Sequence, residues 1–123
     1  MDKQLKVIVI EDEAINLLFL KFLLESIGVT VLDEAGDIDT AVEKITRLKP
    51  DLILVDIKLN KNSNGIDLVK ILQKSYGNIM HIYCTAYADQ TILDQCKQTN
   101  PIGFLNKPID EIRLRKLIDS ISS

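Results

Sequence analysis

Two short apolar runs of this 123-residue chain end in acidic residues. Residues 5–10 lead into Glu11 and Asp12, and residues 52–55 lead into Asp56. Apolar runs of this length between polar residues are typical of strands that are buried on both faces, as in a parallel sheet. Open α/β sheets place their functional sites at the carboxyl ends of the strands. If the two strands are neighbours, the three carboxylates meet at one edge of the sheet.

Carboxylates gathered in this way repel one another. Two unit charges about 4 Å apart repel by roughly 4 kcal/mol at an effective dielectric constant of about 20. The repulsion is relieved when one group takes up a proton or when a cation binds between them. Mg²⁺ suits such a place because it uses few protein carboxylates and keeps waters that a phosphate can replace. The alternative is a set of unrelated solvated acids, but two strand ends of this kind in one small domain favour the metal site.

Length and composition indicate one globular domain. The chain is 46% hydrophobic and 27% charged, and its net charge of −3 provides no basic surface for nucleic acid. Its apolar stretches are too short to span a bilayer, and the amino terminus lacks the apolar segment of a signal peptide. Cys84 and Cys96 lack a metal-binding spacing. We expect free thiols in a reducing cytosol, with a disulfide as the less favoured alternative.

Strand and helix patterns alternate along the chain. The predicted strands cover residues 6–10, 29–32, 52–56, 79–84 and 103–105, and apolar residues at helical spacing occur within 14–27, 38–48, 68–72, 91–98 and 114–121. This alternation predicts an α/β fold with a parallel sheet covered on both faces and joined by right-handed crossovers. His81 lies inside the fourth predicted strand, and as a single histidine there it is assigned no functional role.

Four short motifs follow or end predicted strands in a characteristic order: Glu11-Asp12, Asp56, Thr85-Ala86 and Lys107-Pro108. With Phe104 and Gly65, they resemble the receiver domain of two-component response regulators, and among these the chemotaxis regulators, from about residue 5 to residue 121. The resemblance implies a flavodoxin-like, doubly wound sandwich of five parallel strands in the order 2-1-3-4-5. It also implies a single receiver domain over residues 1–123.

The resemblance assigns chemistry to the acids. Asp56 would accept a phosphoryl group from the phosphohistidine of a sensor histidine kinase or a histidine phosphotransfer protein. Mg²⁺ would be bound by Glu11, Asp12, Asp56 and the backbone carbonyl of Lys58. The Lys107 ammonium and the metal would offset the charge of the transferred group. The chain would be a phosphoacceptor switch with self-catalysed transfer and autodephosphorylation only, and not an enzyme.

The resemblance also implies a conformational change. The Thr85 hydroxyl and the Ala86 amide would bind the phosphoryl group, and Phe104 would move into the space that Thr85 leaves. Phe104 lacks the hydroxyl of the commoner tyrosine, so the change would depend on packing, and a static core aromatic is the alternative. The bond between Lys107 and Pro108 is expected to be cis on the same resemblance. Lys58 and Tyr87 would flank the site and slow hydrolysis, unless they are ordinary loop residues.

The helix predicted over residues 14–27 is apolar on two sides. Leu20 and Ile27 mark its core face, whereas Ile15, Leu18 and Phe22 form a second stripe at spacings of three and four. Because this helix follows Asp12, a helical kinase or phosphotransfer domain would dock on the second stripe. Tolerated surface aliphatic residues are the alternative.

The sequence supports two other functions less well. A haloacid-type phosphatase would need an acid two residues after its nucleophile, where Lys58 stands. A degenerate receiver that only binds partners would not be expected to keep the complete set of Glu11, Asp12, Asp56, Thr85 and Lys107. We therefore expect a cytoplasmic signalling switch that acts on an unknown effector and binds neither nucleic acid nor membrane directly. Homodimerisation is left open, as is the choice between a stand-alone regulator and part of a larger kinase or regulator.

Overall fold

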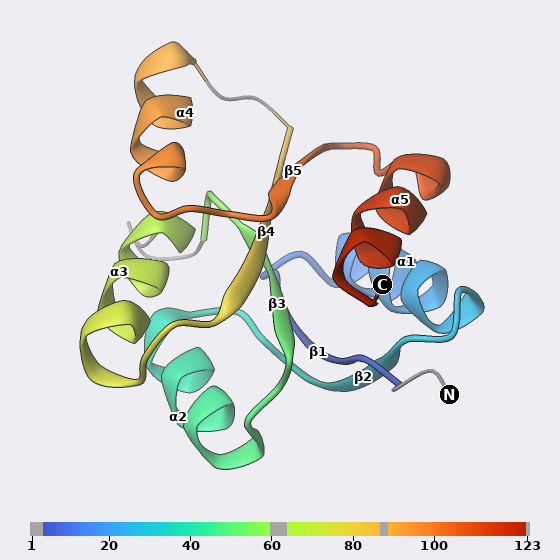
Figure 1. The fold of residues 1–123 in the computed structure, drawn as a ribbon, viewed down its shortest axis with the longest axis horizontal. Coiled ribbons are helices and arrows are strands. Elements are labelled where there is room, and N and C mark those ends of the chain that lie inside the picture. Colours follow the sequence, from blue (N-terminus) through green and yellow to red (C-terminus); the bar gives the residue numbers. More distant parts are fainter. Residues whose placement is uncertain (1–3, 60–63, 87–88, 123) are drawn as a thin grey trace.

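The computed structural model describes residues 4–59, 64–86 and 89–122, which fold around a five-stranded parallel sheet (Figure 1). The strands are β1 (Lys6–Ile10), β2 (Thr30–Ala35), β3 (Leu52–Asp56), β4 (Met80–Thr85) and β5 (Gly103–Asn106), and the helices are α1 (Ala14–Ser26), α2 (Ile38–Leu48), α3 (Gly65–Ser75), α4 (Gln90–Lys97) and α5 (Glu111–Ser122). The strand order is β2-β1-β3-β4-β5, as the sequence resemblance predicted.

The sheet is the middle of three layers. Helices α1 and α5 cover one face, and α2, α3 and α4 cover the other (Figure 1). Because successive side chains of a strand point to opposite faces, β3 contributes to both cores. Leu52 and Leu54 pack in the cluster with α1 and α5, whereas Ile53 and Val55 pack in the cluster with α2, α3 and α4. The whole of β3 is buried, which fixes the position of the acid at its end.

Most element boundaries agree with the sequence prediction to within one or two residues. The helices α3 and α5 extend three residues beyond the apolar residues that indicated them, at both ends of α3 and at the start of α5. Among the strands, β2 is the exception. The prediction ended this strand at Leu32, but the strand continues to Ala35. The two added polar residues, Asp33 and Glu34, are tolerated because β2 is an edge strand that pairs only with β1. The Lys44 ammonium of α2 lies 3.0 Å from the Asp33 carboxylate and also donates to the Glu34 carbonyl.

Four helices are preceded by a polar residue whose side chain accepts a hydrogen bond from the first turn, and for α5 this is Asp110, which accepts from the Ile112 amide. Asp37 accepts from the Thr40 amide, Asn64 from the Asp67 amide and Asp89 from the Ile92 amide. Asn64 and Asp89 also fix where α3 and α4 start after β3 and β4. Both helices therefore begin at the carboxyl edge of the sheet.

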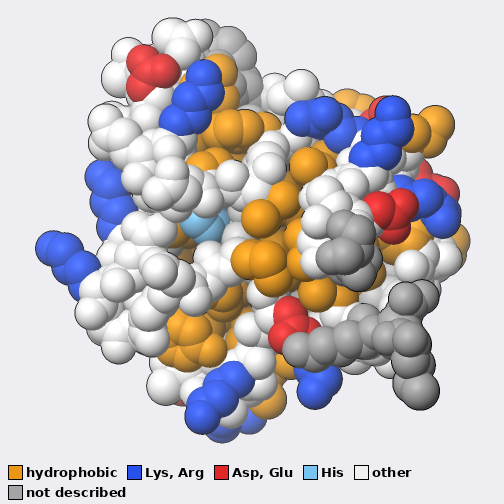
Figure 2. All heavy atoms as spheres, in the orientation of Figure 1, with side chains coloured by type: hydrophobic (Ala, Val, Ile, Leu, Met, Phe, Trp, Pro, Cys, Tyr) orange, Lys and Arg blue, Asp and Glu red, His pale blue; other side chains and the backbone are white. Residues whose placement is uncertain are grey.

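The distribution of charged side chains, the helix lengths and the state of the cysteines match what the sequence composition indicated. On the face shown in Figure 2, Lys and Arg side chains lie mostly around the rim, mixed with acidic ones, and apolar side chains fill the space between the helices. Among the described parts of the chain, no helix combines the length and apolar character of a bilayer span. Cys84 and Cys96 are both free and buried, as predicted.

Candidate functional site

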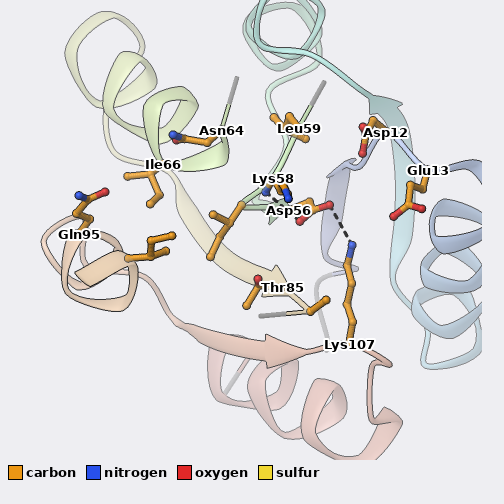
Figure 3. Close-up of a pocket in the computed structure, with 13 residues that line it drawn as sticks. Asp12, Glu13, Asp56, Lys58, Leu59, Asn64, Ile66, Thr85, Gln95 and Lys107 are labelled. Carbon is orange, nitrogen blue, oxygen red and sulfur yellow. Dashed lines mark hydrogen bonds and ion pairs between the residues drawn. The ribbon is translucent and has the colours of Figure 1, made fainter. Parts of the chain in front are cut away.

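The carboxyl edge of the sheet brings together acids and a lysine from distant parts of the chain. Asp56 ends β3, and Glu11 and Asp12 follow β1, which pairs with β3 in parallel register. The Lys107 ammonium, just after β5, lies 3.0 Å from Asp56 Oδ2 (Figure 3). It also lies 2.7 Å from Glu11 Oε1. Thr85, at the end of β4, lines the same pocket. The predicted convergence of these segments is therefore observed.

The acids form a group that can hold a metal ion. One ligand oxygen from each of Glu11, Asp12 and Asp56 lies within 4.8 Å of the others, and Glu11 and Asp56 are buried. Carboxylate oxygens are the ligands that hard divalent cations prefer. Three carboxylates and the single Lys107 ammonium leave two negative charges, which a divalent cation would balance. The donor atoms and the charge of the site thus both fit Mg²⁺.

Burial and the charges of neighbouring side chains shift the pKa values of the site residues. Burial, together with the Glu11 charge, raises the pKa of Asp56 to about 6, although hydrogen bonding to Lys107 opposes this shift. Burial and the Glu11 side chain also raise the pKa of Asp12. Burial alone would lower the pKa of Lys107, but its contacts with Glu11 and Asp56 outweigh burial and raise it. Lys107 is therefore a firmly charged ammonium beside a carboxylate that costs free energy to ionise.

Local packing holds the chain that follows Asp56. The Lys58 amide lies 3.2 Å from Asp56 Oδ1, and Lys58 pairs with Asn64 in an isolated antiparallel bridge. The Gly65 amide donates to the Ile57 carbonyl at 2.7 Å. A side chain at Gly65 would overlap Val55 and the Asp56 carbonyl, so glycine is needed for this close approach. The backbone carbonyl of Lys58 as a metal ligand stays a prediction.

The site opens into a pocket of about 590 Å³ (Figure 3). Asp12, Asp56, Lys58, Thr85, Ala86 and Lys107 line it, as do Glu13, Ile57, Leu59, Asn64, Ile66, Ile92 and Gln95. Sequence reasoning missed the second group. Ile92 and Gln95 have no individual motif, and only the placement of α4 after Thr85-Ala86 would have indicated them. Part of the pocket lining is apolar and is formed by Ile57, Leu59, Ile66 and Ile92. Binding of a phosphoryl group alone does not require such a lining.

Two predicted residues do not line this pocket. Glu11 joins the site through Lys107, and its Oε2 accepts the Glu13 amide at 3.1 Å. Phe104 is half-buried on β5 and stacks on Tyr83 of β4, with ring centroids 5.9 Å apart. The peptide bond between Lys107 and Pro108 is cis, as predicted. Tyr87, which was expected to flank the site, lies outside the described residues.

Comparison with known proteins agrees with this arrangement. Residues 7–119 match the family model described as "Response regulator receiver domain". The chain therefore belongs to the response regulator receiver domain family. Members of this family are phosphoacceptor switches of two-component signalling rather than classical enzymes, and they bind Mg²⁺ in an acidic pocket.

The similar proteins differ in how much of their length the chain covers. The chain is 30% identical to the chemotaxis protein CheY of Thermotoga maritima over 95% of this chain and 97% of that protein. It is 35% identical to the sensory transduction protein LytT of Bacillus anthracis over 89% of this chain, but it spans only 44% of LytT. A solved signal receiver domain of a modulated diguanylate cyclase from Desulfovibrio desulfuricans G20 matches with a TM-score of 0.87 and 30% identity, covering 96% of this chain and 93% of that one.

Proposed function

We propose that Asp56 accepts a phosphoryl group from a phosphohistidine on a sensor histidine kinase or a histidine phosphotransfer protein, and that Mg²⁺ is required. The observation that carries this proposal is the position of the Lys107 ammonium between the Asp56 and Glu11 carboxylates, beside the acidic group that can hold a metal. This combination provides an acceptor oxygen and two sources of positive charge at one edge of the sheet. The residues form one receiver domain over positions 1–123, which works in the cytoplasm.

The transfer needs positioning and charge neutralisation more than covalent help from other groups. An Asp56 carboxylate oxygen forms the new bond to phosphorus as the bond from phosphorus to the donor imidazole nitrogen breaks. The electrons of that bond stay on the imidazole nitrogen, and the ring leaves as neutral imidazole because its other nitrogen carries a proton. Bound Mg²⁺ supplies charge stabilisation for the transferred group. Lys107 already contacts Asp56, so its ammonium needs little movement to reach a phosphoryl oxygen.

Two further pocket residues can donate hydrogen bonds to the phosphoryl group once it is on Asp56. Thr85 and Ala86 follow one another at the end of β4, and the Thr85 hydroxyl and the Ala86 amide are donors for phosphoryl oxygens. Hydrolysis by water would return Asp56 to its carboxylate and end the signal. Lys58 occupies the place where a haloacid-type phosphatase would need its second acid, which argues against that function.

The partner would approach along α1. Ile15, Leu18 and Phe22 are 82%, 66% and 68% exposed, so the second apolar stripe of this helix lies on the surface. The helix begins directly after Glu13, which lines the phosphoryl pocket. A helical donor domain seated on this stripe would bring its phosphohistidine to the pocket.

Incubation with acetyl phosphate and Mg²⁺, followed by mass spectrometry of the intact protein, tests the proposal. We expect a phosphoryl mass increment that is absent from Asp56→Asn and absent when the metal is chelated. Asp119→Asn, which changes an exposed acid on α5, is the matched control and should be labelled like the wild type. A wild-type protein without the increment, or a labelled Asp56→Asn variant, would overturn the proposal.

A further inference from the structure

A second polar cluster lies inside the layer between the sheet and helices α3 and α4. His81, Tyr83 and Thr99 are each at most 3% exposed. His81 and Tyr83 belong to β4, and Thr99 follows the end of α4. Buried polar groups cost free energy unless they are hydrogen bonded, and this cluster is bonded throughout. None of its three members lines the phosphoryl pocket.

The Thr99 hydroxyl is the junction of the cluster. Its oxygen lies 2.6 Å from the Cys96 carbonyl, 2.8 Å from the Tyr83 hydroxyl and 3.0 Å from His81 Nε2. The Thr99 amide also donates to the Cys96 carbonyl, and its own carbonyl accepts from the Gln73 side chain of α3 at 2.9 Å. Thr99 therefore ties the carboxyl end of α4 to both β4 and α3.

Counting hydrogens indicates a direction for the hydrogen bond between Tyr83 and Thr99. His81 Nδ1 must carry a hydrogen, because it lies 3.1 Å from the Ile79 carbonyl, which can only accept. Burial lowers the pKa of His81, so the ring is neutral and its Nε2 is an acceptor. The single Thr99 hydrogen then has two acceptors available, the Cys96 carbonyl and His81 Nε2. This count favours Tyr83 as the donor to Thr99, and burial keeps its hydroxyl protonated by raising its pKa to about 12.

The Tyr83 ring also contacts Phe104, the aromatic residue of the predicted switch. Tyr83 and Phe104 pair across β4 and β5, and their rings stack with centroids 5.9 Å apart and an interplanar angle of 24°. On its other side the Tyr83 ring meets His81 edge-on, with centroids 5.2 Å apart. Tyr83 also stands two residues before Thr85, so both side chains point to the same face of the sheet. The Tyr83 ring is thus held in place between Phe104 and Thr99.

We propose that Tyr83 is the positioning residue that couples the phosphoryl pocket to the carboxyl end of α4, through its stacking on Phe104 and its hydrogen bond to Thr99. This inference rests on the proposed function of Asp56 and on the displacement of Phe104 that the family resemblance implies when Asp56 is phosphorylated. When Phe104 is displaced, the stacked ring cannot follow without straining or breaking its bond to Thr99. The end of α4 must then shift, or the bond must open. Phe104 has no hydroxyl of its own, whereas the Tyr83 hydroxyl is hydrogen bonded to Thr99.

Removing only the hydroxyl tests this coupling. Amide hydrogen exchange at residues 96–100 is compared with and without acetyl phosphate and Mg²⁺. In the wild type, phosphorylation should change the exchange rates there, and in Tyr83→Phe the change should shrink by at least about threefold. Tyr76→Phe is the matched control, since Tyr76 is a half-buried tyrosine that packs on the same core, and it should respond like the wild type.

A second pair of variants separates coupling from simple stability. Thr99→Ser keeps the hydroxyl and should keep the response, whereas Thr99→Val has a similar shape without it and should lose the response. A purely structural role would raise exchange equally with and without acetyl phosphate. The inference is overturned if Tyr83→Phe responds as the wild type does, or if a labelled wild type shows no change at residues 96–100. Absence of label on wild-type Asp56 would instead refute the proposed function on which the inference rests.

Discussion

Gly65 at the start of α3 lies so close to Asp56 that a methyl group on it would overlap the Asp56 carbonyl oxygen. The same methyl group would overlap Val55 Cγ1. The backbone of β3 and the first turn of α3 therefore fit together only with glycine at this position. This contact fixes the distance between the end of β3 at Asp56 and the start of α3.

The Gly65→Ala variant should lose stability and reactivity together. We expect a loss of roughly 1–3 kcal/mol in the free energy of unfolding, because the added methyl must displace backbone and a buried valine. Labelling by acetyl phosphate should slow as Asp56 moves. Urea denaturation and intact-mass kinetics measure the two effects. Gly77→Ala, at a glycine with open space but positive φ, separates a packing clash from backbone strain. Unchanged labelling in Gly65→Ala would contradict this role.

The stability of the metal-free protein should depend on the charge of Asp56. Its pKa of about 6 lies above the value of about 4 for an exposed aspartate, so the folded state binds more protons between these values. The free energy of unfolding should therefore fall as the pH rises from about 4 to about 6. Asp56→Asn removes this loss and should be more stable than the wild type at pH 7 by roughly 1–3 kcal/mol, with the difference vanishing below about pH 4.

Denaturation at both pH values, in the presence of a chelator, measures this effect. Mg²⁺ should then stabilise the wild type but not Asp56→Asn, because only the wild type retains the full set of acids. A less stable Asp56→Asn at neutral pH without metal would show that burial does not penalise this carboxylate.

Lys107 should matter for folding as well as for transfer. Lys107→Met leaves Glu11 and Asp56 buried without their shared cation, and we expect a loss of about 3 kcal/mol at neutral pH. The rate of labelling should fall on the order of 100-fold, as when one electrostatic donor is removed from an active site. Lys116→Met, an exposed lysine on α5, is the control for the loss of charge. Labelling of Lys107→Met at the wild-type rate would exclude a direct role for the ammonium.

Lys58 should lengthen the life of the phosphorylated form. Its side chain lines the pocket, where it can hinder the approach of water to the acyl phosphate. We expect Lys58→Ala to lose the phosphoryl group several-fold faster once acetyl phosphate is removed. Lys70→Ala, an exposed lysine on α3, should decay like the wild type. If the wild type and both variants lose the phosphoryl group at the same rate, Lys58 does not protect it from hydrolysis.

The α1 stripe should affect transfer from a protein donor only. Leu18→Glu combined with Phe22→Glu places two charges on the proposed docking surface and should abolish transfer from a phosphorylated kinase or phosphotransfer domain. Labelling by acetyl phosphate should remain, because neither residue lines the pocket. Ile71→Glu, at an exposed apolar residue on α3, is the control. Equal loss of both reactions, or of neither, would argue against docking on α1.

The sequence predicted the reactive edge because each acid there follows an apolar strand whose burial is evident from its residues. Asp56 is the clearest case, since all of β3 is buried. The end of β2 was missed because Asp33 and Glu34 are stabilised by a lysine from another element, which a local pattern does not include. The bonds of Thr99 to His81 and Tyr83 join residues 18 and 16 positions apart. His81 had been assigned no role, because its partner was not evident from its neighbours in the chain.

The pairing of Lys107 with Glu11 joins residues 96 positions apart. During synthesis the ribosome therefore releases every acid of the site long before it releases the lysine. A growing chain that contains β1 and β3 but not residue 107 has the acids of the site without the ammonium that contacts Glu11 and Asp56. If the proposed function holds, full reactivity would therefore be reached only after β5 and Lys107 have been made, and a chain truncated before them would be labelled slowly.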